Sequence, residues 1–361
     1  MTDKFQNYGG LEEPTEKPNV ENDETITSGN KNLFDNYPAL TNQLSRTEEA
    51  KAIIEKPLLD QNVPGFEKET NQDGLEKLII ELNSLVGLAK VKGEIQMLLQ
   101  FVKVQELRRK KEISTSKPSL HSVFYGSPGT GKTTIARLYG KMLSAMGLLS
   151  KGHLVETDRS GLVGGFIGQT AIKTDEKVKE ALGGILFIDE AYSLAKGEES
   201  SRDYGEEAIA ILLKRMEDYR DDFVVIVAGY PEPMGKFIAS NEGLRSRFNT
   251  YIHFDDYSPS EMAEIFKRLC KTENYAPTEE ALEFVFTAID YNYSIRDKSF
   301  GNARYIRNLF EIVIRNQALR IGNTLKNPSP EDLRVILPGD IPFVTPADTN
   351  VIQNSKTKKE R

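Results

Sequence analysis

The segment GSPGTGKT, residues 126–133, has the residue types and spacing of a phosphate-binding loop. It matches the pattern G-x-x-x-x-G-K-[ST] in full, directly after an apolar run and before a helical pattern. Glycines let the backbone wrap and aim its N–H groups at phosphate oxygens, and the start of the next helix adds the positive end of its dipole. The segment therefore predicts a nucleotide phosphate site, with a glycine-rich structural turn as the alternative.

The side chains at the end of this segment add charge and oxygen ligands. Lys132 supplies a point charge for the outer phosphates, and Thr133 offers its hydroxyl to Mg²⁺. We expect ATP to contact the whole loop: Gly126, Ser127, Pro128, Gly129, Thr130, Gly131, Lys132, Thr133 and Thr134.

An acidic pair follows a second apolar run, ILFI at 185–188. Asp189 would hold Mg²⁺, and Glu190 would act as the general base that polarises the attacking water. This pair favours ATP hydrolysis over GTPase or small-molecule kinase chemistry. A solvated acidic turn is the alternative.

A sheet is needed to hold these residues together. Strand-like runs alternate with helical patterns, and they occupy residues 122–125, 153–156, 185–189, 224–229 and 251–254. The third and fourth runs are almost continuously apolar, as expected of parallel strands covered on both faces. The pattern predicts an α/β fold with an open five-stranded parallel sheet and helical crossovers.

The strand-like runs stop near residue 258. Ser258 is expected to cap a helix that begins at Pro259. Apolar residues then recur at helical spacing, first at Met262, Ile265, Phe266 and Leu269, which predicts one apolar stripe. We therefore expect an α/β domain over residues 76–257 and a small all-helical domain over residues 258–343.

Charge separates the N-terminal segment from the rest of the chain. Residues 1–75 hold 7 Lys and Arg against 15 Asp and Glu, a net charge of −8, whereas the whole chain carries −7. The remainder is close to neutral, which gives little electrostatic reason to bind nucleic acid. The acidic composition predicts a disordered N-terminal extension, and we expect a disordered tail over residues 344–361.

Composition also limits the location. No apolar run is long enough for a membrane span, and the N-terminus lacks the basic start and apolar core of a secretory signal. The single cysteine excludes an intrachain disulfide and a cysteine-based metal cluster. We therefore expect a cytoplasmic protein.

Several stretches together resemble the AAA+ ATPase superfamily, and most closely the branch that includes stage V sporulation protein K and red-type rubisco activase (CbbX/CfxQ-like). The resemblance covers about residues 78–343 and includes GSPGTGKTTIARLYGKML, ALGGILFIDEAYSLAKG, FIASNEGLRSRFNTYIHFDDYS and FGNARYIRN. It implies an AAA+ P-loop NTPase fold followed by a helical lid domain. It also implies a ring, usually a hexamer, with the nucleotide between subunits.

The resemblance assigns further roles near the nucleotide. Arg247 of GLRSRF matches the arginine finger that reaches into a neighbouring subunit's site, with Arg245 as a second candidate; surface ion pairs are the alternative for both. Arg304 of GNAR matches the sensor-2 arginine, which would couple hydrolysis to rotation of the lid.

Two further positions follow from the same resemblance. Val86 and Gly87 belong to a segment whose backbone packs against the adenine. Tyr230 stands at the end of the fourth strand-like run, where the superfamily usually has a polar sensor-1 residue, often Asn. Its hydroxyl would orient water.

The glycine-rich stretch GLVGGFIGQT, residues 161–170, falls at the first pore loop of such rings. Phe166, Ile167 and Gly168 match the aromatic, aliphatic and glycine residues that line the axial channel. A phenylalanine can grip any extended polypeptide by apolar contact. Packing of Phe166 in the core of its own subunit is the alternative. A second, polar loop at 195–207 is also expected to face the channel.

The main hypothesis is a chaperone-like, ring-forming motor that uses ATP and Mg²⁺ to remodel or partly unfold a protein client. Two alternatives stay open. One is a nucleotide-dependent assembly, scaffold or switch protein in which nothing is threaded. The other is a DNA-remodelling AAA+ ATPase, against which the near-neutral body argues. We expect no membrane span and no nucleic-acid partner.

Overall fold

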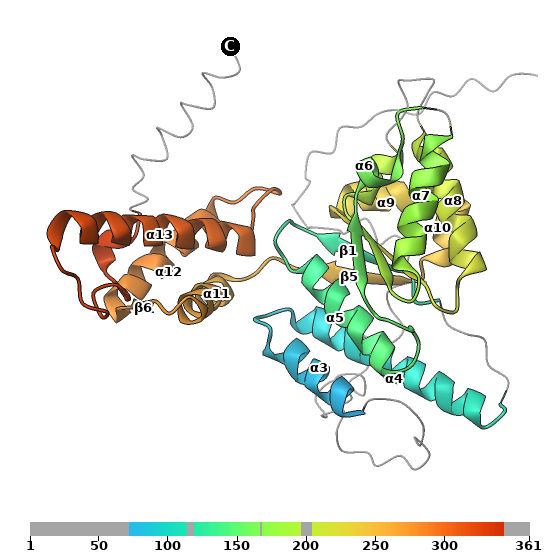
Figure 1. Cartoon of the computed structure of the whole chain (residues 1–361), viewed down its shortest axis with the longest axis horizontal. Helices are drawn as coiled ribbons and strands as arrows, with labels where there is room; N and C mark the ends of the chain where they lie inside the picture. Colours follow the sequence, from blue (N-terminus) through green and yellow to red (C-terminus); the bar gives the residue numbers. More distant parts are fainter. Residues whose placement is uncertain (1–71, 114–118, 167, 196–203, 343–361) are drawn as a thin grey trace, which may run out of the picture. The chain divides into compact units, whose positions relative to one another are not determined.

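The computed structural model describes residues 72–342 apart from 114–118, 167 and 196–203 (Figure 1). The predicted tail and nearly all of the predicted N-terminal extension lie outside these described residues. The first described helix, α3 (Gln72–Ser84), begins within the last residues of that predicted extension.

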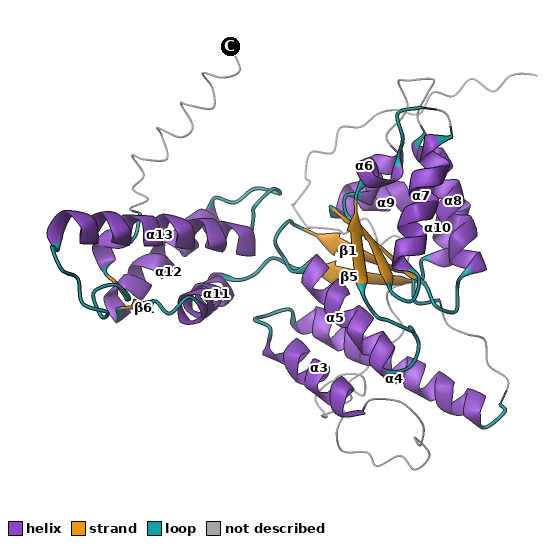
Figure 2. Ribbon diagram, in the orientation of Figure 1, coloured by secondary structure: helices purple, strands orange, loops and turns teal. Residues whose placement is uncertain are grey.

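Five parallel strands form the sheet that carries the site, in the order β2-β3-β4-β1-β5 (Figure 2). In the register, Val227 on β4 pairs with Val123 on β1 and with Ile188 on β3, so the carboxyl ends of these strands lie at one edge. The predicted parallel sheet is confirmed. The strands are β1 (Ser122–Gly126), β2 (Leu154–Thr157), β3 (Ile185–Ile188), β4 (Val224–Gly229) and β5 (Thr250–Phe254).

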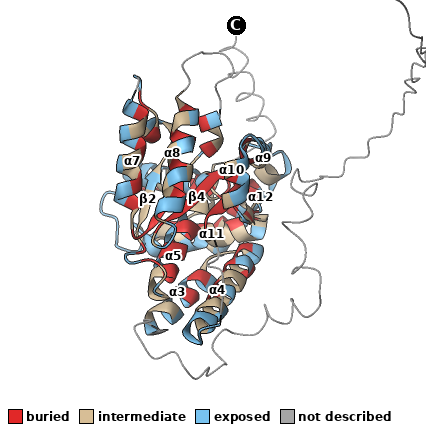
Figure 3. Cartoon of the chain, turned by 90° about the vertical axis from the view of Figure 1, so that its right-hand side faces the viewer, coloured by how far each residue is buried: buried red, intermediate tan, exposed pale blue. Residues whose placement is uncertain are grey.

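Helices cover both faces of the sheet (Figure 1). Successive strand residues point to opposite faces, and apolar residues lie on both, so each face needs a covering layer. Phe124 and Phe187 pack in the core on the side of α3, α4 (Ala89–Lys110) and α5 (Lys132–Ala145). Val123 and Leu186 pack in the core on the other side of the sheet. Figure 3 colours the buried residues red. The elements on that side are α6 (Arg159–Leu162), α7 (Gln169–Ala181), η2 (Ala191–Ala195), α8 (Gly205–Asp218), α9 (Pro231–Ala239) and α10 (Glu242–Arg247).

The residues that follow β5 form a helical domain with its own core of buried side chains. Ser258 caps the first helix as predicted: its hydroxyl accepts from the N–H of Glu261 at 3.3 Å, and Glu261 Oε2 accepts from the N–H of Ser258 at 2.7 Å. Pro259 is the first helical residue, also as predicted. The elements are α11 (Pro259–Thr272), α12 (Glu279–Ser294), α13 (Ala303–Thr324) and η3 (Pro338–Asp340).

A short strand pair departs from the all-helical prediction for this domain. β6 (Ala276–Pro277) pairs in parallel with β7 (Val335–Ile336). The Ala276 N–H donates to the carbonyl of Arg334 at 2.8 Å. A strand of two residues has no alternation of apolar and polar side chains for a sequence pattern to reveal.

Candidate functional site

The predicted phosphate loop, residues 126–133, connects β1 to α5 at the carboxyl edge of the sheet. Gly129 and Gly131 have φ angles of 72° and 97°, in the left-handed region that glycine adopts at little cost. A Cβ at Gly129 would also collide with the carbonyl oxygen of Gly301. Both glycines are therefore required by the backbone path of the loop.

The loop forms part of the wall of a cavity of about 440 Å³, a volume that suits a nucleotide. Most of the predicted nucleotide residues line it: Gly126, Pro128, Gly129, Gly131, Lys132, Thr133, Thr134, Asp189, Glu190, Tyr230, Val86 and Arg304. Three do not, namely Ser127, Thr130 and Gly87. Thr130 instead uses its hydroxyl to bond the carbonyl of Ser127 at 2.8 Å.

The Lys132 side chain donates hydrogen bonds to the loop and also carries a positive charge into the cavity. Its Nζ donates to the carbonyls of Gly126 at 2.9 Å and Ser127 at 2.8 Å. An ammonium group has three hydrogens, which leaves the third for a phosphate oxygen. Burial lowers the pKa of Lys132 to about 8, Asp189 opposes that shift, and Arg304 adds to it. Lys132 is therefore still mostly protonated at neutral pH but holds its proton less tightly than a solvated lysine, and a bound anion would raise its pKa again.

The acidic pair follows β3 directly, and both residues line the same cavity. The N–H of Glu190 donates to Asp189 Oδ1 at 3.0 Å. Glu190 has a φ of 46°, a left-handed conformation that costs a non-glycine residue roughly 1–3 kcal/mol. Thr133 and Asp189 bring hydroxyl and carboxylate oxygens to this cavity, and Mg²⁺ prefers oxygen ligands of this kind. The residues present thus fit a magnesium nucleotide.

Two tyrosines accompany Glu190. Tyr230 lines the cavity directly before Pro231, the first residue of α9, and its ring lies 6.4 Å from that of Tyr192. Burial, and after it the negative charge of Glu190, raises the pKa of Tyr192 to about 12. Tyr192 is therefore a neutral phenol beside the predicted general base. Sequence reasoning missed it, since only its position two residues after Glu190 could have suggested a role.

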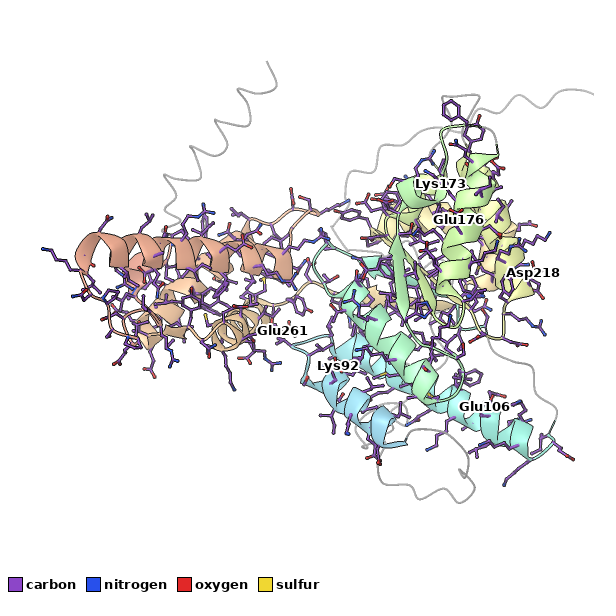
Figure 4. The ribbon with its side chains drawn as sticks, in the orientation of Figure 1. Lys92, Glu106, Lys173, Glu176, Asp218 and Glu261 are labelled. Atoms are coloured by element: carbon purple, nitrogen blue, oxygen red, sulfur yellow. The ribbon has the colours of Figure 1, made fainter. Side chains whose placement is uncertain are left out.

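Part of the cavity lining is apolar. It consists of Leu85, Val86, Leu88, Ile265 and Leu269. Gly87 does not line the cavity but allows the turn, because its φ is 59° and a Cβ there would collide with Glu261 of α11, which Figure 4 labels. Such a lining suits a nucleobase. Sequence reasoning placed Ile265 and Leu269 only in the core stripe of α11.

Positive charge reaches the cavity from the helical domain. Arg304, the predicted sensor-2 residue, and Arg307 lie on α13 and line the cavity, as does Arg268 of α11. Sequence reasoning found Arg304 through the GNAR stretch and missed the other two. Together with Lys132 these cations match the charge of a triphosphate.

The two predicted arginine-finger candidates do not line this cavity. Both lie in the last turn of α10. Arg245 is exposed, and its Nη2 donates to the carbonyl of Ala239 at 3.2 Å. Arg247 is half-buried with its Nη2 3.8 Å from Glu217 Oε2, and its Nε is buried without a hydrogen-bond partner among the described residues. Neither arginine therefore serves the cavity of its own chain.

Phe166 lies on the loop between α6 and α7 and does not line the cavity. Its side chain is 73% exposed, so the alternative in which it packs in the core of its own subunit is wrong. The base of the loop is fixed, because the N–H of the buried Gly164 donates to Thr170 Oγ1 at 3.0 Å. Gly168 is exposed with a φ of 81°, whereas Ile167 lies outside the described residues.

Two family models match adjoining parts of the chain. Residues 122–256 match the ATPase family associated with various cellular activities (AAA), and residues 258–351 match the AAA lid domain. The first match contains β1 to β5 with the phosphate loop and the acidic pair, and the second begins at the capped start of α11.

Relatives with similar sequences cover most of the chain. The chain is 43% identical over 251 residues to stage V sporulation protein K of Bacillus subtilis (strain 168), which covers 68% of this chain and 76% of that protein. It is 42% identical over 262 residues to the chloroplastic ribulose bisphosphate carboxylase/oxygenase activase of Cyanidioschyzon merolae (strain NIES-3377 / 10D), covering 72% and 88%. The crystal structure of the FIGL-1 AAA domain has the same fold, with a TM-score of 0.50 and 18% identity over 82% of this chain and 98% of that one.

The lowered pKa of Lys132 makes nucleotide affinity depend on pH. The phosphate selects the protonated lysine and raises its pKa in the complex, so affinity is full below the free pKa of about 8 and falls as pH rises above it. We expect the Kd for ADP, measured by calorimetry, to rise roughly tenfold between about pH 7.5 and about pH 9.5. Lys132→Arg is the matched control: it stays charged and should bind more weakly without this slope. A wild-type Kd that is flat over this range contradicts the prediction.

Proposed function

Because the chain belongs to the AAA ATPase family, of the type that includes stage V sporulation protein K and rubisco activase, we propose that it couples ATP hydrolysis to the remodelling or partial unfolding of a protein client. ATP hydrolysis itself follows from the family. The observation that carries the coupling to a client is Phe166, an aromatic side chain that is 73% exposed on a loop away from the nucleotide cavity.

Phe166 supports this function through its exposure and its surroundings. Phenylalanine buries a large apolar area when it finds a partner, and its ring has no polar group that would select a particular sequence. Ile172, in the first turn of α7, is exposed as well, at 61%. We infer that Phe166, with Ile167 and Gly168, forms a pore loop that grips an extended polypeptide by apolar contact.

The cavity residues take distinct roles in the proposed hydrolysis. Lys132 and the loop N–H groups bind the outer phosphates, and Arg304 contacts the terminal phosphate from the lid. Thr133 and Asp189 would hold Mg²⁺, which neutralises phosphate charge when it is bound. Glu190 orients the attacking water and accepts its proton.

Tyr192 and Tyr230 complete the water site that we propose around Glu190. The neutral phenol of Tyr192 and the hydroxyl of Tyr230 can each donate or accept a hydrogen bond. They would keep the water near the carboxylate in place of the Asn that related enzymes often use.

A ring, most simply a hexamer, explains the position of the finger candidates. Arg247 and Arg245 lie outside the cavity of their own chain, and a second subunit could receive either of them. We assign the finger to Arg247, because its side chain is half-buried and its direction is therefore restricted. Its Nη2 is 3.8 Å from Glu217 Oε2. A distant ion pair of this kind holds the guanidinium only weakly.

The compartment and the client stay predictions. No helix of the described residues is long and apolar enough to cross a membrane. We propose a cytoplasmic protein with a protein client and without a nucleic-acid partner, on the basis of its single cysteine and near-neutral body.

Replacing Glu190 by Gln should separate ATP binding from ATP hydrolysis. The amide cannot accept the proton of the attacking water, so we expect turnover to fall at least about 100-fold while the Kd for ATP stays within about threefold. Steady-state ATPase assays and nucleotide titration measure the two quantities. Glu283→Gln on the exposed side of α12 is the control and should hydrolyse ATP normally. A Glu190→Gln protein with wild-type turnover would refute the assignment.

Replacing Arg247 by Ala should lower turnover on the order of 100-fold, because the transition-state charge loses a donor from the neighbouring subunit. The Kd for ATP should change little. Arg245→Ala is the matched control from the same turn of α10 and should retain most activity. If the Arg245 variant loses activity and the Arg247 variant does not, the finger is Arg245. If both retain activity, α10 supplies no finger.

Replacing Phe166 by Ala tests threading against scaffolding. Clients are first identified by co-purification with a Glu190→Gln protein, with and without residues 1–75. Client remodelling and ATP turnover are then measured together for Phe166→Ala and for Phe166→Tyr, which keeps the ring. We expect the number of ATP molecules consumed per client remodelled to rise at least about tenfold for the Ala variant, because apolar grip is lost. An unchanged ratio would favour the scaffold or switch function.

A further inference from the structure

Three consecutive carbonyls of the phosphate loop are held by groups that follow β5 in the chain. The carbonyl of Pro128 accepts from Asn302 Nδ2 at 3.3 Å, and that of Gly129 accepts from the N–H of Ala303 at 3.2 Å. The carbonyl of Thr130 accepts from Tyr257 Oη at 3.3 Å. The middle of the loop is thus bonded along its length to the linker and to the first residues of α13.

These bonds fix the direction of the loop's N–H groups. In a planar trans peptide the N–H of one residue points opposite to the carbonyl of the residue before it. Holding the carbonyls of 128–130 therefore also sets the N–H groups of 129–131, which point away from the linker and lid contacts. N–H groups held in advance bind an anion without a further cost of ordering.

Asn302 is the residue on which these contacts converge. It is fully buried, and its Oδ1 accepts from the N–H of Tyr257 at 3.0 Å. Its Nδ2 lies 2.9 Å from Asp256 Oδ1, 3.2 Å from the carbonyl oxygen of Phe300 and 3.3 Å from that of Pro128, so its two hydrogens are shared among three acceptors. One amide thus connects the loop, the linker after β5 and the turn before α13.

The backbone of Asn302 indicates that this amide is needed. Its φ of 48° and ψ of −121° lie in a region that glycine adopts and other residues adopt only under strain. A glycine at 302 would relieve that strain. The residue is nevertheless an asparagine, and its side chain makes the contacts to Pro128, Asp256, Tyr257 and Phe300.

We propose that Asn302 is a positioning residue for nucleotide binding: its amide, with the N–H of Ala303 and the hydroxyl of Tyr257, sets the peptide planes of residues 128–130 so that the following N–H groups face the phosphates. The inference rests on the assignment of residues 126–133 as the nucleotide loop. It does not depend on the client or on the pore loop.

Two variants test this role. Asn302→Asp keeps the shape and the acceptor for Tyr257, but it presents a carboxylate oxygen to Asp256 and to two carbonyls. Asn302→Gly removes the amide and relieves the backbone. Asn323→Asp, exposed near the other end of α13, is the matched control.

We expect the Kd for ADP, measured by calorimetry on the full chain, to rise at least about tenfold in both Asn302 variants and to stay unchanged in the control. The KM for ATP should rise more than kcat falls, since the loss lies in binding. The melting temperature without nucleotide separates positioning from stability. The Gly variant gains from the relief of strain and loses the hydrogen bonds of a buried amide, so each Kd is measured below the melting temperature of the variant concerned.

The outcomes are distinct. Weaker binding by a Gly variant that melts like wild type supports the proposal. A lowered melting temperature with unchanged Kd and KM in the folded variants overturns it, and so does wild-type behaviour of both. A wild-type chain that bound no ADP would instead refute the loop assignment itself.

Discussion

A phosphate site made of backbone depends on one constraint: its N–H groups must face the cavity, so each of its carbonyls needs a donor elsewhere. Residues 126–131 meet this constraint from several directions. Lys132 bonds the first two carbonyls, and Asn302, Ala303 and Tyr257 bond the next three. The first turn of α5 bonds the last. The sheet, the linker and the helical domain are all arranged around this short loop.

The electrostatics of the cavity follow from the same arrangement. Lys132 is half-buried, with its Nζ bonded to two carbonyls of the loop, and desolvation lowers its pKa to about 8. Arginines on α11 and α13 add positive charge, while Asp189 and Glu190 add negative charge at the end of β3. Phosphates would therefore meet cations from two domains, and the carboxylates of Asp189 and Glu190 come from the end of β3.

Local sequence patterns predicted the parts of this site that lie close together in the chain. The strands and the Ser258 cap were confirmed, because a few neighbouring residues specify each of them. The roles of the phosphate loop and of the acidic pair stay predictions, although residues of both line one cavity. The fold and the family resemblance were also confirmed.

Residues that reach the site from a distance were harder to find. Ile265 and Leu269 showed the spacing of a core stripe, and nothing in that spacing distinguishes a residue facing a core from one facing a cavity. Asn302 has no pattern of its own, since its contacts lie more than 40 residues away along the chain at Asp256 and Tyr257, and more than 170 away at Pro128. The order of Arg247 before Arg245 came from the resemblance, and the half-buried side chain of Arg247 adds a structural argument for the same order.

The close approach of Gly129 to the carbonyl of Gly301 also limits how domains could be exchanged between this protein and a relative. Both partners are backbone, so a larger residue at 129 cannot be compensated by a smaller side chain at 301. A chimera that exchanged helical domains at the start of α11 would replace the 301–303 turn and keep the old phosphate loop. The phosphate loop and the 301–303 turn would therefore have to be transferred together, although they belong to different domains.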